Sequence, residues 1–182
     1  MVVSLAQGVS FDAESHEYWY KGKKLSGVTG IISKKLNQKL PEYLMGEHQV
    51  EGIHIHTSVA QWIETGVSPS IHPGVAWVVK ALLKECNDRI SLHAEVLVTD
   101  YKQYASAVDV VYEHDGKLSL YDIKKGIFNR EYCTWQLSIY KYLIEKHTEW
   151  KVGDLWVLCI KDETWYPIVP KDAGEVEELL YA

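Results

Sequence analysis

The sequence has no uninterrupted apolar run that approaches the roughly 20 residues of a membrane-spanning helix, which argues against a membrane protein. It has no basic N-terminal region followed by an apolar stretch, so we expect no secretory signal. It also has no internal repeat, low-complexity tract or obvious linker. A chain of 182 residues can bury a substantial core but is short for two domains, so we expect one domain over residues 1–182.

Cysteine is scarce, and the three cysteines are scattered along the chain: Cys86, Cys133 and Cys159. A disulfide framework would require an even number, and a zinc or iron–sulfur site would require paired or four thiolates. We therefore expect buried, reduced thiols and a cytoplasmic location.

The formal net charge of −6 does not favour a generic nucleic-acid binder, because phosphate contacts need cations. The charges are unevenly distributed, however. Residues 21–39 contain six lysines and no acid, whereas residues 171–182 contain four acids and one lysine. A basic N-terminal region on an acidic protein is compatible with DNA and equally compatible with a solvated surface.

The spacing of apolar residues predicts blocks of helix and strand. Residues 9–25, with a Lys21-Gly22 turn, resemble a β-hairpin, and helices are predicted over 26–36, 42–64 and 75–87. Strands are then predicted over 93–99, 105–113 and 118–124, with an Asp115-Gly116 turn between the last two. A helix over 129–147, strands over 155–160 and 165–169, and a helix over 175–181 follow. This order predicts one α/β domain with a central mixed sheet flanked by helices.

Two acids and a lysine lie on the paired strands of this sheet. Asp109 is on the first strand and Asp122 near the end of the second, so the tight turn between them allows both carboxylates to reach one point. Converging carboxylates repel unless a cation lies between them, and Mg²⁺ suits such a site. Lys124, two residues after Asp122, is on the same strand face and could stabilise negative charge on a phosphate. On their own, two such acids and a lysine are more often surface or capping residues than a site.

Alternation along the strand over 93–99 makes a further prediction. It places Ala94, Val96 and Val98 on one face and Glu95 and Leu97 on the other.

Several motifs around the acids and the lysine occur in a fixed order. Val108-Asp109 followed by Tyr121-Asp122-Ile123-Lys124-Lys125-Gly126 resembles the core of the PD-(D/E)XK nuclease superfamily. Gln136 and Tyr140 match the Q-x-x-x-Y motif of its recombination-type and phage exonuclease branch, which includes lambda-exonuclease-like and RecB-like nuclease domains. Gly52 and His56 resemble the G-x-x-x-H helix of that branch, and Glu95 resembles its additional acidic position.

The likeness extends from about residue 11 to 145, because residues 11–32 also resemble small phage-type members. The chain departs from the family in two respects. Val108 replaces the proline before the first aspartate, a position that performs no chemistry, and the four cysteines of iron–sulfur members are missing. The resemblance implies a restriction-endonuclease-like core.

The resemblance also implies the roles of individual residues. The metal ligands would be His56, Asp109, Asp122 and the backbone carbonyl of Ile123, and Lys124 would be the catalytic lysine. Glu95 would be a further catalytic acid. His54 competes with His56, but on a helix the two side chains point about 200° apart, and only His56 has the motif spacing from Gly52.

Gln136 and Tyr140 would lie one helical turn apart and position the water, the lysine or the DNA phosphate. Tyr140 is otherwise explained as a core aromatic residue, and Gln136 as an exposed helix position.

The expected function is a Mg²⁺- or Mn²⁺-dependent deoxyribonuclease, and by resemblance an exonuclease of phage recombination or bacterial DNA repair. DNA would be the substrate, with a single-strand annealing protein and a homo-oligomeric ring as further associations. One alternative is a non-catalytic DNA-binding or assembly subunit that keeps the nuclease fold. A second is an unrelated α/β protein in which the acids have a structural role.

Overall fold

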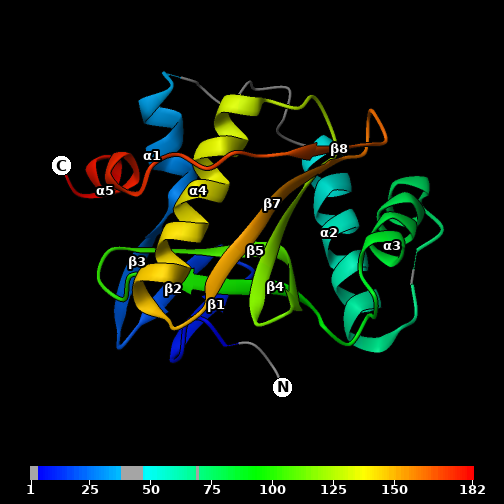
Figure 1. The fold of residues 1–182 in the computed structure, drawn as a ribbon, viewed down its shortest axis with the longest axis horizontal. Helices are drawn as coiled ribbons and strands as arrows, with labels where there is room; N and C mark the ends of the chain where they lie inside the picture. The colour runs from blue at the N-terminus through cyan, green and yellow to red at the C-terminus, as the bar shows by residue number, and fades with distance from the viewer. Residues whose placement is uncertain (1–3, 38–46, 69) are drawn as a thin grey trace.

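The computed structural model describes residues 4–37, 47–68 and 70–182. One sheet of eight strands forms the centre of this part of the chain, and helices lie on both sides of it (Figure 1). Parallel and antiparallel pairs both occur in the sheet. The predicted α/β class with a helix-flanked mixed sheet is therefore confirmed.

The N-terminal region forms three antiparallel strands rather than the predicted two-stranded hairpin: β1 (Val9–Asp12), β2 (Glu17–Tyr20) and β3 (Lys23–Gly27). β3 continues into the main sheet because Ser26 and Gly27 pair in parallel with the start of β5 (Tyr104–His114). The helix predicted from residue 26 consequently begins later, as α1 (Val28–Lys35).

The central strands surround β5. β4 (Leu92–Thr99) pairs antiparallel with one edge of β5, and β6 (Lys117–Lys124) pairs antiparallel with the other. α4 (Arg130–His147) connects β6 to the parallel strand β7 (Lys151–Cys159), which begins four residues before the predicted strand. β8 (Thr164–Pro167) and α5 (Ala173–Tyr181) complete the chain.

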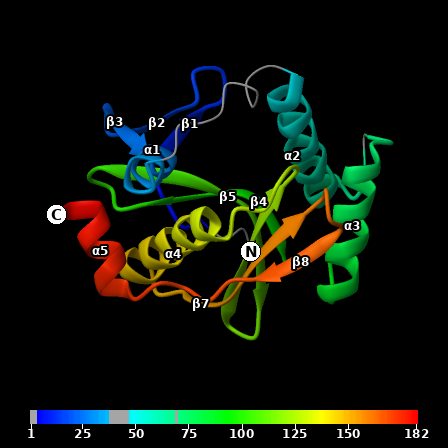
Figure 2. The same ribbon diagram turned by 90° about the horizontal axis from the view of Figure 1, so that it is seen from above.

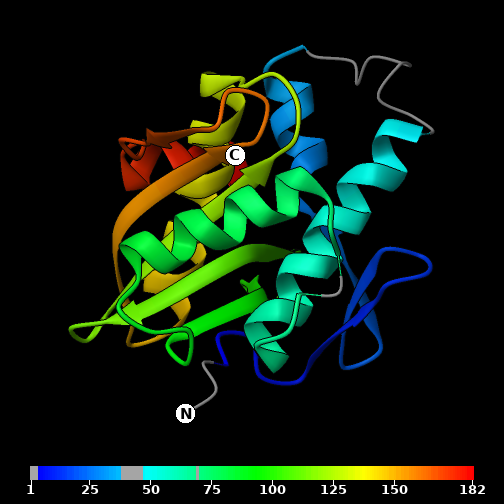
Figure 3. The ribbon, with the colours of Figure 1, turned by 90° about the vertical axis from the view of Figure 1, so that its right-hand side faces the viewer.

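The helices divide between two faces of the sheet. α2 (Glu47–Thr65) and α3 (Pro73–Glu85) cover one face, and α4 covers the other together with α1 and α5 (Figures 2 and 3). The first five residues of the helix predicted over 42–64 lie outside the described residues. None of the helices in the described ranges is long and apolar enough to cross a membrane.

β4 changes face in the middle. Ala94 packs with α2 and α3, whereas Val96 and Val98 belong to the core beneath α4, so the prediction that all three share one face is wrong. The reason lies at Glu95, whose φ of 50° is in the left-handed region and interrupts the regular alternation of side chains. Glu95 lies across from Asp109 of β5, between two regular strand pairs.

Candidate metal centre and catalytic residues

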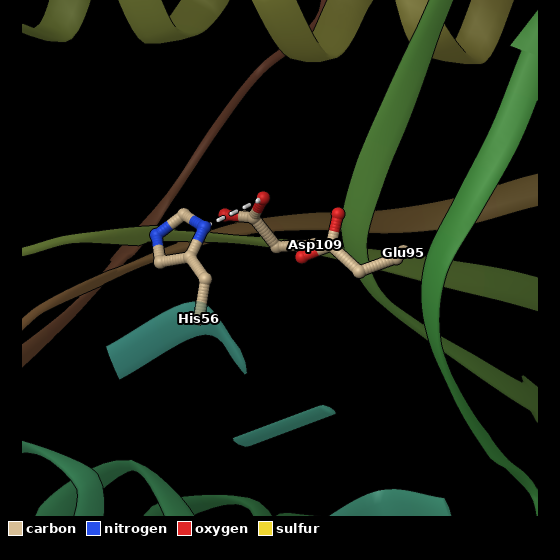
Figure 4. Close-up of side chains that lie close together, drawn as sticks. All are labelled: His56, Glu95 and Asp109. Atoms are coloured by element: carbon tan, nitrogen blue, oxygen red, sulfur yellow. Dashed lines mark ion pairs between the residues drawn. The ribbon is translucent and has the colours of Figure 1, made fainter. Parts of the chain in front are cut away.

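Three metal-binding side chains converge between α2 and the sheet. His56 comes from α2, Glu95 from β4 and Asp109 from β5, and one ligand atom of each lies within 4.8 Å of the others. Figure 4 shows the Asp109 carboxylate between the imidazole and the Glu95 side chain. The register between β4 and β5 contributes to this convergence, because it places Glu95 opposite Asp109.

The His56 ring is oriented by contacts on both nitrogens. Nε2 lies 3.1 Å from the backbone carbonyl oxygen of Ile123, and Nδ1 lies 3.4 Å from Asp109 Oδ1. The other Asp109 oxygen, Oδ2, accepts a hydrogen bond of 2.7 Å from the Ile123 amide. The adjacent Asp109 carboxylate raises the pKa of His56, with burial acting in the opposite direction. The site therefore attracts positive charge.

Glu95 is an exposed side chain in a concave part of the surface. It is among the residues that line an open cavity of about 730 Å³ between the beginning of β1, the end of α2 and residues 92–97 of β4. Loss of surrounding water raises the pKa of Glu95 to about 7, and the negative charge of Asp109 adds to this increase. Two carboxylates held this close are stabilised by a cation.

The cluster fits a hard or borderline divalent cation. Its donors are two carboxylates and one imidazole, a set that suits Mg²⁺ through the carboxylates and Mn²⁺ through all three. Two ligands of one Mg²⁺ ion lie at most about 4.2 Å apart, so small side-chain movements would close the 4.8 Å spacing. The Ile123 carbonyl is adjacent, and its second lone pair could serve as the predicted backbone ligand.

Asp122 and Lys124 form a separate ion pair on the α4 side of the sheet. Lys124 Nζ lies 3.1 Å from Asp122 Oδ1, to which it donates a hydrogen bond, and 2.8 Å from Oδ2. Oδ2 is buried and makes no hydrogen bond with any residue that the structure describes. Burial is the largest single influence and acts against the charge of Lys124, but the surrounding negative groups, Asp122 first, together outweigh it and raise the pKa of the lysine. The ammonium group therefore keeps its proton.

The structure does not gather Asp122 into the same ligand group as Asp109. The close group consists of His56, Glu95 and Asp109, and Asp122 is outside it. Asp122 nevertheless lies near enough for its pKa, raised mainly by burial and lowered by Lys124, to be raised further by Asp109. Asp122 Oδ2 accepts no hydrogen bond from the described residues, and its charge is balanced by the Lys124 ammonium at 2.8 Å.

Lys124 is held by a chain of buried polar groups. Its Nζ donates to Gln136 Oε1 at 3.1 Å, and Gln136 Nε2 donates to the Tyr140 hydroxyl at 2.9 Å. The Tyr140 hydroxyl is in turn 3.1 Å from Ser106 Oγ on β5. Gln136 is only 7 % exposed, so its interpretation as an exposed helix position is wrong. The geometry of the pair favours orientation of the lysine among the three roles considered.

Ser106 is the last member of this series of hydrogen bonds, although nothing in its sequence context indicates such a contact. It precedes Asp109 by three residues, and only the packing of α4 against β5 brings its hydroxyl to Tyr140. The one available indication is that a small polar residue lies among the apolar residues at the start of β5, where it is buried.

Side chains next to the site connect α2 to the end of β6. Glu51 of α2 forms an ion pair with Lys125, and it also accepts from His72 Nε2 at 2.9 Å. His54 faces away from the cluster and lies 2.9 Å from Ser70 Oγ. Of the two candidate histidines, the structure therefore places His56 in the site.

Comparisons with known proteins add information on the fold. No family model matches the chain, and no curated protein matches it. Among solved structures, the one titled "Crystal structure of SSO0001" is similar, with a TM-score of 0.50 and 14% identity, over 89% of this chain and 76% of that chain. A likeness at this identity concerns the fold alone.

Proposed function

We propose that this chain is a metal-dependent DNA phosphodiester hydrolase, and specifically an exonuclease of phage recombination or bacterial DNA-repair type. The observation that carries the proposal is the convergence of His56, Glu95 and Asp109 within 4.8 Å, beside the buried Asp122–Lys124 pair. Functional groups of this kind, on one helix and neighbouring strands of one sheet, suit hydrolysis of a phosphate ester. The motifs that resemble the PD-(D/E)XK superfamily support DNA as the substrate.

His56, Glu95 and Asp109 would hold Mg²⁺ or Mn²⁺, with Asp122 and the Ile123 carbonyl as further ligands. A bound ion of this kind supplies Lewis acidity and lowers the pKa of a water molecule. The protonated Lys124 stabilises the negative charge that develops on the phosphate. Its place is fixed by Asp122 and Gln136, so no reorganisation is needed during the reaction.

The proposal also covers the surroundings in which the protein acts. Three buried free cysteines fit a reducing, cytoplasmic location. By resemblance to the exonuclease branch, a homo-oligomeric ring and a single-strand annealing partner belong to the same proposal. A ring would place the DNA in an interior of different charge from the acidic exterior.

The test compares linear and covalently closed circular DNA in the presence of Mg²⁺ or Mn²⁺. We expect degradation of the linear form only. Asp109→Asn and Lys124→Met should each lower the rate by about 100-fold or more, because each removes a charge from the site. Asp154→Asn, an exposed acid on β7, is the matched control and should keep the wild-type rate.

Each other outcome identifies which part of the proposal is wrong. Wild-type rates in both site variants would disprove the site, and cutting of closed circles would disprove the exonuclease mode. DNA binding without hydrolysis would favour the non-catalytic subunit. Absence of Mn²⁺ binding at millimolar concentration, measured by calorimetry, would favour a structural role for the acids.

A further inference from the structure

Two lysines from distant parts of the chain lie against one tryptophan of α4. Lys35 Nζ is 4.7 Å from the centre of the Trp135 ring system, and Lys171 Nζ is 5.1 Å from it. Lys35 ends α1 and Lys171 precedes α5, so three elements meet at this position. Trp135 is only 3% exposed, because its neighbours cover the indole. The two ammonium groups are therefore held at fixed positions on the surface.

The unpaired positive charge at this surface comes from the end of α1, because Lys171 is paired with an acid and precedes the acidic residues of α5. Glu131 is the acid in contact with it, and it lies 3.2 Å from Lys171 Nζ and accepts from the Trp135 indole N–H at 3.0 Å. Lys34 and Lys35 are exposed, α1 contains no acidic residue, and neither lysine forms an ion pair with any residue of 4–37, 47–68 or 70–182. Two unpaired cations thus remain at the end of α1 on a protein of net charge −6.

The same two turns of α4 also hold the catalytic lysine. Glu131 and Trp135 face the surface lysines, whereas the next residue, Gln136, accepts a hydrogen bond from Lys124. Lys124 Nζ also lies 5.9 Å from the Tyr132 ring centre. One short helical segment thus connects the candidate catalytic residue to a fixed pair of surface cations.

We infer that Lys35 and Lys171 form a binding surface for the phosphate backbone of DNA, next to the hydrolytic site. The inference rests on the proposed function, because it assigns this surface to the same substrate. Phosphates beyond the scissile one would contact the two ammonium groups while the scissile phosphate reaches Lys124. The unpaired lysines at the end of α1 would also attract the phosphates of DNA to this position.

The lysines of the basic N-terminal region lie in two separate parts of the structure. Lys23 donates a hydrogen bond to the backbone carbonyl of Lys102 at the turn after β4. Lys35, at the end of α1, contacts Trp135 of α4. Lys24 is paired with Glu17. Within residues 21–39, the structure thus favours the end of α1 as the part that contacts DNA.

The test measures the binding of a short fluorescein-labelled duplex by anisotropy over a range of salt concentrations, with Ca²⁺ in place of Mg²⁺. Log affinity falls as log salt rises. We expect the Lys35→Gln/Lys171→Gln variant to make this dependence shallower by about 1.8 in slope, because two phosphate contacts at about 0.9 each are lost. Lys35→Arg/Lys171→Arg should restore the wild-type slope. Lys80→Gln/Lys84→Gln removes the same total charge from exposed positions of α3 and should leave the slope unchanged.

A wild-type slope in the Lys35→Gln/Lys171→Gln variant would overturn the inference, as would an equal decrease in the α3 control or no binding by the wild type. The arginine variant reports on folding, because it keeps the charge and the contact with Trp135. Hydrolysis is measured separately. DNA cleavage with an unchanged slope would disprove only this surface, and the expected slopes without cleavage would disprove only the hydrolytic function.

Discussion

Glu95 combines an unusual backbone conformation with an unfavourable electrostatic position. Its φ is left-handed, the register of β4 with β5 puts it across from Asp109, and burial together with the Asp109 charge raises its pKa to about 7. A carboxyl group whose pKa is raised by folding stabilises the protein when protonated. That contribution is complete below the ordinary pKa of 4.5 and is lost as the pH rises through 7. In the metal-free protein, the negative charge that Glu95 carries at neutral pH and above therefore destabilises the folded state.

We predict that Glu95→Gln stabilises the metal-free protein at pH 8 and has little effect at pH 4.5. Because Glu95 is exposed, solvent screening reduces the expected gain to about 1 kcal/mol, or an increase in Tm of about 2–4 °C. Thermal melts in EDTA measure the difference at each pH.

Adding Mn²⁺ should reverse the order of stability, because wild type keeps all three side chains of the group while the variant has lost one carboxylate. Glu64→Gln, an exposed acid near the end of α2, is the control and should show no gain. Equal melting temperatures of wild type and Glu95→Gln across the pH range would contradict the electrostatic interpretation of the site.

At the scale of elements, α4 is attached to the sheet through a hydrogen bond between buried side chains. The Tyr140 hydroxyl and Ser106 Oγ are 3.1 Å apart, and Gln136 continues the hydrogen-bonded network to Lys124. Burial raises the pKa of Tyr140 above its usual value, so the hydroxyl stays protonated and can donate. A helix that packs through its apolar residues alone would leave the lysine less firmly placed.

We predict that Ser106→Ala and Tyr140→Phe each destabilise the protein by about 1–2 kcal/mol, and that the double variant loses about 1 kcal/mol less than the sum. Urea unfolding of the four proteins gives this coupling. Both single variants should also lower the rate of DNA cleavage, by up to about 100-fold, with KM nearly unchanged, because they act on the position of Lys124. Additive free energies would show that the two hydroxyls do not interact.

The sequence predicted the central elements better than the ends and the side-chain contacts. α4 and β6 are clear because apolar spacing and a turn define them locally. The Lys21-Gly22 turn was predicted and separates β2 from β3, whereas the division between β1 and β2 was missed because residues 13–16 contain no glycine or proline to indicate a turn. The change of face at Glu95 was missed because alternation assumes regular backbone angles.

The candidate site was predictable to the extent that short motifs carry it. His56, Glu95 and Asp109 have recognisable spacing, and the structure brings them together. Asp122 and Lys124 form a separate pair because their side chains lie on the α4 side of the sheet, whereas the group of three lies on the α2 side. Ser106 depends on the packing of a helix 34 residues away, which no local pattern reports.

At the scale of the whole molecule, the three cysteines lie within the packed interior. All are buried and free, as expected from their number and spacing. Burial raises the pKa of Cys86 to about 11 and that of Cys133 to about 12, and it also raises the pKa of Cys159. At pH 8 only about one in a thousand Cys86 thiols is ionised.

We predict that the native protein reacts slowly with Ellman's reagent at pH 8, and that all three thiols react at once in guanidinium chloride. The reaction rate then reports how often the core opens. Cys86→Ser, which removes one thiol, should release two equivalents in denaturant and identifies the contribution of the α3 end. Rapid release of a full equivalent from the native wild type would contradict the packing described for the core.

The left-handed residue in β4 also has a consequence for self-association. β4 has a strand neighbour along one edge only, within the described part of the chain, and an exposed edge invites pairing with another molecule. Glu95 divides this eight-residue edge into regular stretches of three residues (92–94) and four residues (96–99) and adds an exposed charge between them. Neither stretch offers a long template for a foreign strand, so the residue that brings an acid to the candidate metal centre also protects the sheet from aggregation.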